Sequence, residues 1–416
     1  MDRIRADHHY TISYSKAYHA KWKAMERIFG NWEESYAELP LYVDALRRSN
    51  PGTTVFFEGP VIQENNMGRP IRQFERVFWA FGPALEAFKH CRPLVCIDGT
   101  HLYGKYKGNL LIATACDAEN GLLPIAFAIV ESENRSSWTF FLWNLFFSVG
   151  GINNLCVISD RHLGIIAGMK DIEESWLDQV PPQTWALCYD DGRRHGTMTT
   201  NRAESMNSVL KGVRGLPITA ILQQTFIRVS EYFYTRRESA ESMSGEHVPS
   251  MQQHLERTAH DARAMLVRRL DRSEFNVQDK NAVMYIVFLY SDNAECQCHV
   301  PKLFHYPCAH VIAACGYARI SPGRYVSHWL SSESYRHTYE PRFHSVDDKS
   351  RWPIPTENDP IFIPPNVRRQ AGRPVSTRRR MHMDSRDPSL RYTCSICHEK
   401  GHRKNKCPRR NTNAGN

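Results

Sequence analysis

Residues 91–130 read CRPLVCIDGTHLYGKYKGNLLIATACDAENGLLPIAFAIV and carry the clearest structural signal in the chain. Three apolar runs lie within them, at Leu94–Ile97, Asn109–Cys116 and Leu123–Val130. Each run has the length of a buried strand and is short for a helix. The last two runs are separated by Asp117–Gly121, whose Asn-Gly pair favours a hairpin turn. We therefore predict three strands that follow one another as a meander.

A helix and a fourth strand follow this meander. Six apolar residues recur at helical spacing and would share one face: Trp138, Phe141, Leu142, Leu145, Phe146 and Val149. Ser136 or Ser137 could cap the start of this helix, and Gly150-Gly151 would end it. The next apolar run, Leu155–Ser159, predicts a strand that ends at Asp160. This order of elements predicts a mixed α/β fold.

The composition is that of a globular protein, because 42% of the 416 residues are hydrophobic and 23% are charged. The length allows two or three domains. No run approaches the roughly 20 apolar residues of a membrane helix, so we expect no membrane partner. We find no secretory signal, and we therefore expect the 12 cysteines to be thiols and zinc ligands rather than disulfides.

Four residues near the end of the chain have the spacing of a zinc knuckle, C-x2-C-x4-H-x4-C. They are Cys394, Cys397, His402 and Cys407. Tetrahedral Zn2+ takes four such ligands, and pairs this close in sequence let a few residues fold around the ion. The neighbouring lysines and arginines could contact phosphates, and Tyr392 could stack on a base. We expect this knuckle to bind zinc, and single-stranded nucleic acid or a partner protein.

A second cluster with the pattern C-x-C-x9-C-x-H lies upstream. Its members are Cys296, Cys298, Cys308 and His310. Pro307 suits the start of a helix that would carry His310. Spacing alone does not exclude His299 or His305 in place of His310. With the knuckle, this cluster predicts two structural Zn2+ ions in the protein.

The positive charge is concentrated at the C-terminal end. Residues 361–416 contain 14 Lys or Arg and 3 acidic residues, a net charge of +11, so the preceding 360 residues sum to −2. This tail predicts contacts with nucleic-acid phosphates. Arg378–Arg380 could serve as a nuclear import signal, and we expect the protein in the nucleus. Gly372-Arg-Pro374 is typical of an AT-hook core that binds A·T-rich DNA, and equally of a basic linker.

Three acidic residues could form a second kind of metal site. Asp98 and Asp160 each follow a predicted strand, where α/β sheets usually place their chemistry. On a helix, Glu204 would face the same direction as Asn201 and Asn207. Three converging carboxylates need divalent cations to offset their repulsion, and two Mg2+ ions roughly 4 Å apart suit displacement at phosphorus. An aspartate after a strand is also typical of a turn or cap, and the pattern alone leaves both interpretations open.

Residues 91–162, which end in VISDRH, resemble the Mutator-like (MULE, MuDR) transposases of plants. Asn-x-x-Glu-x-x-Asn at 201–207, the upstream zinc cluster (a SWIM finger in that family), Gly-Arg-Pro and the CCHC knuckle follow in the order of the family. The resemblance implies an RNase H-like fold with a DDE triad of Asp98, Asp160 and Glu204. It implies Mg2+ or Mn2+ at this triad, cleavage of DNA at transposon ends, and joining of the 3′ end to a target.

The chain departs from this family between the second and third acids. Members usually carry a further core strand, a Cys-x2-His motif and a helical insertion there. Only 44 positions separate Asp160 from Glu204, and Cys188 and His195 are seven apart, so they do not form that motif. The resemblance therefore implies a shortened core that lacks part of the sheet and the insertion.

These signals divide the chain into six predicted regions. They are a helical region (1–90), an RNase H-like domain (91–215), a helical segment (216–274), a SWIM zinc finger (275–320), a Pro/Arg-rich linker (321–390) and a CCHC knuckle (391–410). The function implied by resemblance is a DDE transposase, active or degenerate, that binds transposon ends or A·T-rich DNA, and an oligomer is compatible with it. The alternatives are a non-catalytic nuclear zinc-finger protein that binds DNA or a partner protein, and an RNA-binding knuckle protein.

Overall fold

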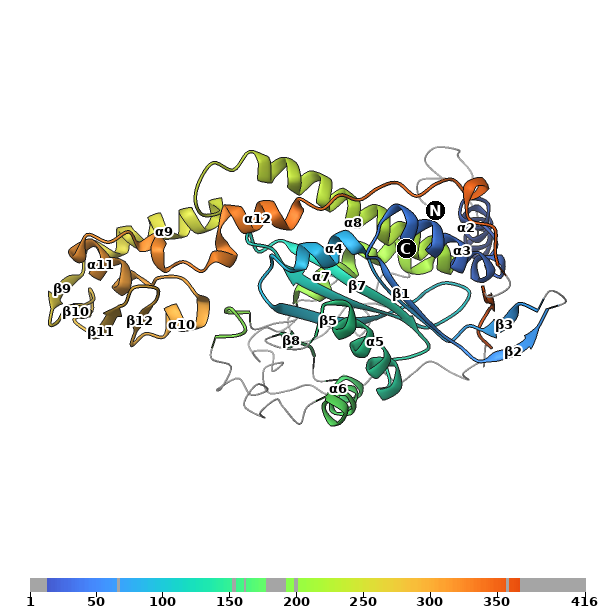
Figure 1. Ribbon diagram of the computed structural model, residues 1–416, viewed down its shortest axis with the longest axis horizontal. Coiled ribbons are helices and arrows are strands. Elements are labelled where there is room, and N and C mark those ends of the chain that lie inside the picture. Colours follow the sequence, from blue (N-terminus) through green and yellow to red (C-terminus); the bar gives the residue numbers. More distant parts are fainter. Residues whose placement is uncertain are drawn as a thin grey trace, which may run out of the picture. The chain divides into compact units, whose positions relative to one another are not determined.

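A six-stranded sheet with the order β1-β4-β7-β6-β5-β8 lies at the centre of the fold (Figure 1). The computed structural model describes residues 13–65, 68–151, 155–160, 162–176, 192–197, 201–356 and 359–366. Contacts divide the chain into Met1–Val367 and Arg368–Asn416, and all described residues belong to the first unit. The predicted knuckle and its basic surroundings therefore lie outside the described residues. Within those ranges, no helix is long and apolar enough to cross a bilayer.

The predicted meander is confirmed in the middle of this sheet. β5 (Leu94–His101), β6 (Asn109–Cys116) and β7 (Leu122–Val130) pair antiparallel in that order. Asn120, in the turn between β6 and β7, has a φ of 62°, as expected for an Asn-Gly hairpin turn. β8 (Cys156–Ile158) pairs with the other side of β5 and runs parallel to it. A parallel neighbour requires a crossover connection, which the helix between β7 and β8 supplies.

The sequence predicts a helical region over residues 1–90, and this prediction is wrong for its second half. α2 (Tyr14–Phe29) and α3 (Glu34–Ser49) are helices, but β1 (Thr54–Glu58) and β4 (Arg76–Ala80) extend the central sheet beyond β7. All five residues of β4 are buried, so the sequence lacks the alternation that would indicate a strand. The other elements of this region are β2 (Val61–Glu64), β3 (Pro70–Gln73) and α4 (Gly82–Phe88).

One face of the sheet, here called the α5 face, is covered by α5 (Arg135–Ser148), and α6 (Leu163–Trp176) packs against α5 (Figure 1). Phe141 of α5 contacts Phe78 of β4, with ring centroids 5.9 Å apart. The cap of α5 is Asn134 rather than Ser136 or Ser137. Its side-chain oxygen accepts a hydrogen bond from the Ser137 backbone N–H at 2.8 Å.

The opposite face, here called the α7 face, is covered by α7 (Asn201–Val209) and α8 (Ile218–Glu241), which are joined by the 3-10 helix η3 (Leu210–Gly215). Trp79 of β4 donates a hydrogen bond to Thr225 of α8 at 3.2 Å. Opposed residues of antiparallel strands share a face, and the register runs from Trp79 through Phe127 and Ile112 to Asp98. Asp98 therefore lies on the face that α7 and α8 cover.

A second sheet with the order β12-β11-β10-β9 carries the upstream cysteine cluster, and we call residues 266–320 the zinc module. Its helix α11 (Ala309–Ala318) packs on the sheet around Phe275, Val287 and Val311, a core separate from the main one. β9 lies inside the predicted helical segment 216–274, which is otherwise helical in α8 and α9. The other elements here are α9 (Pro249–Ala262), β9 (Leu266–Arg269), β10 (Glu274–Gln278), β11 (Met284–Leu289), β12 (Ala294–Cys296) and α10 (Val300–Phe304).

The sequence predicts a linker over residues 321–390, but the described part of this segment is folded onto the core. α12 (Ser332–Tyr339) packs against α8, and the hydroxyl of the buried Tyr339 donates to Asp117 Oδ2 at 2.7 Å. β13 (Ile361–Ile363) pairs in parallel with β3. Prolines suit the extended backbone on both sides of β13, so composition alone did not distinguish this segment from a linker. Three short 3-10 helices complete it: η4 (Pro322–Tyr325), η5 (His328–Leu330) and η6 (Lys349–Arg351).

Candidate active site and metal centre

Asp98 lies within β5 rather than after its end. The strand continues to His101 because Asp98–His101 pair with Asn109–Ile112 of β6. The half-buried Asp98 carboxylate accepts a hydrogen bond from the Gly99 backbone N–H at 2.9 Å and one from Asn207 Nδ2 at 2.7 Å. Asn207 is on α7, so this contact joins the helix to the strand that carries the first predicted acid.

Asp160 follows β8 by two residues, as the sequence predicts, and is exposed. The parallel register pairs Cys96 with Ile158, and extending it by two residues sets Asp98 opposite Asp160. Asp160 lies two residues beyond the last paired residue of β8, so the extended register sets it near the level of Asp98 on β5. Cys96 and Ile158 belong to one buried cluster, and Asp98 follows Cys96 on the same side of its strand.

Glu204 lies on α7, three residues before Asn207. Residues three apart on a helix are neighbours on one face, and α7 packs on β5 and β6. The Glu204 side chain lies outside what the structure describes, so its distance to Asp98 stays a prediction. The structure does place α7, which carries Glu204, on β5, which carries Asp98.

Arg214 is a second polar link on the α7 face, and sequence analysis missed it. Its guanidinium donates to Thr100 Oγ1, two residues beyond Asp98 on β5, and lies 4.9 Å from the ring of Tyr103. Arg214 is only 7% exposed. Lys211-Gly-Val-Arg-Gly215 has no periodic pattern that would indicate a buried cation, so nothing in the local sequence singles this arginine out.

The upstream zinc cluster is assembled in the zinc module, and its four residues could hold a zinc ion. The ligand atoms of Cys296, Cys298, Cys308 and His310 all lie within 4.8 Å of one another. Nδ1 of His310 is 3.5 Å from the Cys296 sulfur and 3.8 Å from the Cys308 sulfur. Tetrahedral zinc with S and N ligands sets such atoms about 3.6 Å apart, so the cluster has the dimensions of a zinc site.

The other two histidines that spacing left open do not join this cluster. Nε2 of His305 lies 2.7 Å from the Gly192 backbone oxygen, and its ring packs against His195 with centroids 4.3 Å apart. His299 lies outside the group of four potential ligands found among the described residues. His310 instead stacks on Tyr285 at 3.9 Å, which holds the imidazole with Nδ1 toward the thiols.

The thiols of the cluster share their hydrogen bonds unequally, so the pKa of Cys296 is raised by its bonds with Cys298 and Cys308 and by burial. Hydrogen bonds with Cys296 and Cys308 lower the pKa of Cys298. Burial opposes the charged form of His310, but contacts with Cys298 and Cys308 outweigh it and raise the pKa of His310 to about 9. Zinc binding would therefore displace a proton from this histidine at neutral pH. The knuckle residues Cys394, Cys397, His402 and Cys407 lie outside the described residues.

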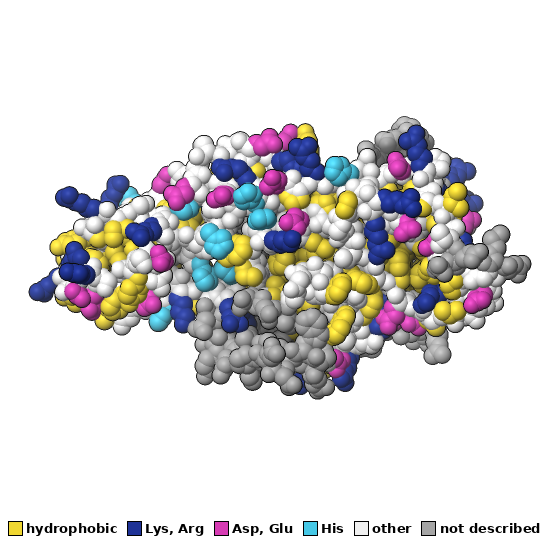
Figure 2. All heavy atoms as spheres, in the orientation of Figure 1, with side chains coloured by type: hydrophobic (Ala, Val, Ile, Leu, Met, Phe, Trp, Pro, Cys, Tyr) yellow, Lys and Arg dark blue, Asp and Glu magenta, His cyan; other side chains and the backbone are white. Residues whose placement is uncertain are grey.

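The outer face of the zinc module's sheet is rich in exposed apolar side chains. Leu266 is 72% exposed, Met284 49% and Ile286 39%. Figure 2 shows hydrophobic side chains in yellow over the region that β9–β12 form. The inner face, with Val277 and Val287, is covered by α11.

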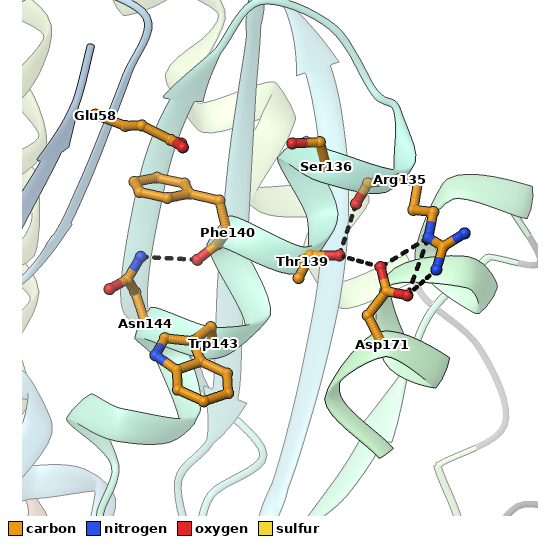
Figure 3. A pocket seen from close by; sticks show the side chains of 8 residues that line it. All are labelled: Glu58, Arg135, Ser136, Thr139, Phe140, Trp143, Asn144 and Asp171. Atoms are coloured by element: carbon orange, nitrogen blue, oxygen red, sulfur yellow. Dashed lines mark hydrogen bonds and ion pairs between the residues drawn. The ribbon is translucent and has the colours of Figure 1, made fainter. Parts of the chain in front are cut away.

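A shallow cavity of about 460 Å³ lies on the α5 face, between α5, α6 and the edge strand β1. Figure 3 shows Trp143 and Phe140 on one side of it and the ion pair of Arg135 with Asp171 on the other. Asp98 is on the opposite face of the sheet. This cavity is therefore separate from the predicted acidic site.

Comparison with known proteins relates the central part of the chain to one family. Residues 94–189 match the family model described as MULE transposase domain. This range contains Asp98 and Asp160, whereas Glu204 and both zinc clusters lie beyond it. No curated protein and no solved structure matches the chain. The match supports a relationship to Mutator-like transposases and a transposase-like or transposase-derived function.

Proposed function

We propose that the protein is a Mutator-like DDE transposase that cuts and joins DNA with the help of divalent cations bound by Asp98, Asp160 and Glu204. One observation supports this above all: the parallel register of β5 and β8, extended by two residues beyond Ile158, sets Asp98 level with Asp160. The helix that carries Glu204 packs on β5 and β6 and contacts Asp98 through Asn207. These placements support a site in which Asp98 from β5, Asp160 after β8 and Glu204 from α7 would meet.

The strand order supports an RNase H-like core. Three antiparallel strands, β7-β6-β5, are followed by β8 in parallel with β5, and α5 and α6 lie between β7 and Glu204 in the chain. We propose that this order belongs to the RNase H-like core that the sequence resemblance implies. β1 and β4 extend the sheet on the side away from β8.

The residues of this region fit a divalent cation. Carboxylate and amide oxygens are the ligands that Mg2+ and Mn2+ prefer. Asn207 donates to Asp98 from Nδ2, and its side-chain oxygen is buried without a hydrogen-bond partner among the described residues. When bound, the cations would activate an attacking oxygen and neutralise charge at the phosphate. Asp98, Asp160 and Glu204 would hold them, and Asn207 would orient Asp98.

The remaining parts of the chain would hold DNA. We propose that the zinc module with Cys296, Cys298, Cys308 and His310 stabilises one binding domain, and that the CCHC knuckle binds a second zinc ion. The basic tail would contact phosphates, at transposon ends or A·T-rich sites, and direct the protein to the nucleus.

A second candidate is a non-catalytic DNA-binding protein derived from such a transposase. Asp160 is exposed, and β8, the strand before it, is the edge of the sheet among the described residues. A carboxylate without support on one side is held less firmly, and a displacement of about 1 Å can lower a rate roughly 100-fold. Such a protein would keep its affinity for DNA and lose cleavage.

Cleavage of DNA from the terminal repeats of the encoding element, in Mg2+ or Mn2+, tests the proposal. We expect Asp98→Ala and Asp160→Ala each to abolish cleavage while DNA binding persists. Asp261→Ala, on the exposed surface of α9, is the matched control and should cleave like the wild type. Metal-dependent cleavage that survives both aspartate substitutions would exclude the triad. Binding without any cleavage by the wild type would favour the second candidate.

A further inference from the structure

The Asn207 side chain makes one hydrogen bond and leaves one buried polar atom without a partner. Nδ2 donates to Asp98 Oδ2 at 2.7 Å. The Oδ1 atom of the same amide is buried and accepts no hydrogen bond from the described residues. A buried carbonyl oxygen without a donor is unfavourable. Of the two polar atoms of the Asn207 amide, only Nδ2 therefore has a hydrogen-bond partner among the described residues.

We propose that Asn207 positions Asp98 in the metal-free protein and becomes a neutral oxygen ligand of the divalent cation when one binds. This inference rests on the proposed function. A half turn about the last side-chain bond exchanges the amide oxygen and nitrogen. An oxygen at the present place of Nδ2 would be 2.7 Å from Asp98 Oδ2. Neighbouring ligands of octahedral Mg2+ lie about 2.9 Å apart, so both oxygens could bind one ion.

Rotation of the amide would give its oxygen, which has no hydrogen-bond partner among the described residues, a partner in the cation. In the new orientation Oδ1 would face the cation, and the amide N–H group would take the buried position. Without the cation, the reverse orientation avoids two oxygens in contact. The amide thus matches the charge state of the site in both forms, which neither a carboxylate nor an alanine could do.

Substitutions of Asn207 are expected to leave the fold intact, because η3, which follows α7, has its own link to β5. Arg214, just after α7, donates to Thr100 Oγ1, and its backbone oxygen accepts from the Tyr103 N–H at 2.8 Å. Met206 of α7 is fully buried in the main core. Ser208, the exposed neighbour of Asn207, offers a control position on the same helix.

The test measures Mn2+ binding to the full-length, zinc-loaded protein by electron paramagnetic resonance, together with Tm with and without Mn2+. The variants are Asn207→Ala, Asn207→Asp, Ser208→Ala and Asp98→Ala. We expect Asn207→Ala to weaken Mn2+ binding by about 10- to 100-fold. Asn207→Asp should lower Tm without metal, because two carboxylates then face each other, yet bind Mn2+ at least as tightly as the wild type. Mn2+ should raise its Tm by more than it raises that of the wild type.

The possible results separate this inference from the proposed function. If Mn2+ binding depends on Asp98 but both Asn207 variants bind like Ser208→Ala, the role of Asn207 is overturned and the metal site stands. A loss of Tm in Asn207→Asp that Mn2+ does not reverse would show a purely structural role and equally overturn it. Wild-type protein without Asp98-dependent Mn2+ binding would overturn both. If Asn207→Ala does not fold, Asn207→Ser takes its place. Mn2+ affinity and Tm are then compared between Asn207→Ser, Asn207→Asp and the wild type.

Discussion

Arg76 binds Glu131 through two hydrogen bonds, from Nε at 2.8 Å and from Nη2 at 2.6 Å. Burial opposes the ionised form of Glu131, but hydrogen bonds from Arg76 and Asn134 outweigh it and lower the pKa of Glu131 to about 2. A carboxyl group whose pKa is lower in the folded protein stabilises the fold above its unfolded pKa. This stabilisation is lost as pH falls through the folded pKa.

We therefore expect Glu131→Gln to lower the free energy of unfolding by about 1 kcal/mol at pH 7, a modest value because solvent screens a side chain that is 45% exposed. The difference from the wild type should shrink between about pH 4.5 and pH 2. Urea denaturation at pH 7 and pH 3 measures this difference in the free energy of unfolding. Glu64→Gln, at an exposed position, is the control. A difference that is the same at both pH values would contradict the assigned pKa.

The sequence could predict the roles of some single residues but not their contacts in the fold. Asp98 and Asp160 could be singled out because each follows an apolar run. The end of β5 could not, because the pairing of Asp98–His101 with β6 continues a strand whose apolar run stops at Ile97. The contact of Asn207 with Asp98 joins residues 109 apart and depends on the tertiary fold. Whether Glu204 completes the site remains a prediction.

At the scale of elements, the zinc module should lose its structure without metal while the central sheet keeps it. The two have separate cores, one around Phe275 and Val287 and the other around the six-stranded sheet. In a module this small, zinc contributes directly to folding. We expect Cys308→Ser to lower the zinc content by one equivalent per chain and to make residues 266–320 sensitive to protease.

Cys315→Ser is the matched control, because Cys315 is fully buried in the same module but is not among the four potential ligands. It should keep the full zinc content even if its packing is weakened. Zinc analysis and limited proteolysis with mapped cleavage sites measure both effects. A Cys308→Ser protein that retains the wild-type zinc content would exclude Cys308 as a ligand.

Elements were predictable where a local pattern was sufficient. β6 and β7 follow from two apolar runs joined by Asn-Gly. β4 is buried on both sides and β13 has three residues between prolines, so neither shows a strand pattern. Both are strands because a distant segment offers hydrogen-bond partners: β7 for β4, and β3 for β13. Such pairing is a property of the folded chain.

At the scale of the whole molecule, charge is divided unevenly along the chain. All 14 basic residues of 361–416 lie at or beyond Arg368, where only 3 acidic residues accompany them, and the preceding part is close to neutral. Affinity for DNA depends on the number of phosphates that cations neutralise, and it falls with salt as counterion release becomes less favourable. We therefore expect most of the non-specific DNA affinity to reside in residues 368–416.

If the tail neutralises about five phosphates, raising salt from 50 to 200 mM should weaken DNA binding on the order of 100- to 1000-fold. A chain ended at Val367 keeps α12 and β13 on the core, so it should stay folded while losing most of this affinity and its salt dependence. Fluorescence anisotropy with a labelled duplex over a salt series measures the slope for both chains. Equal slopes would mean that the phosphate contacts come from the α/β core or the zinc module. In that case residues 368–416 would serve zinc binding by the knuckle and nuclear import, and would add little to the affinity for DNA.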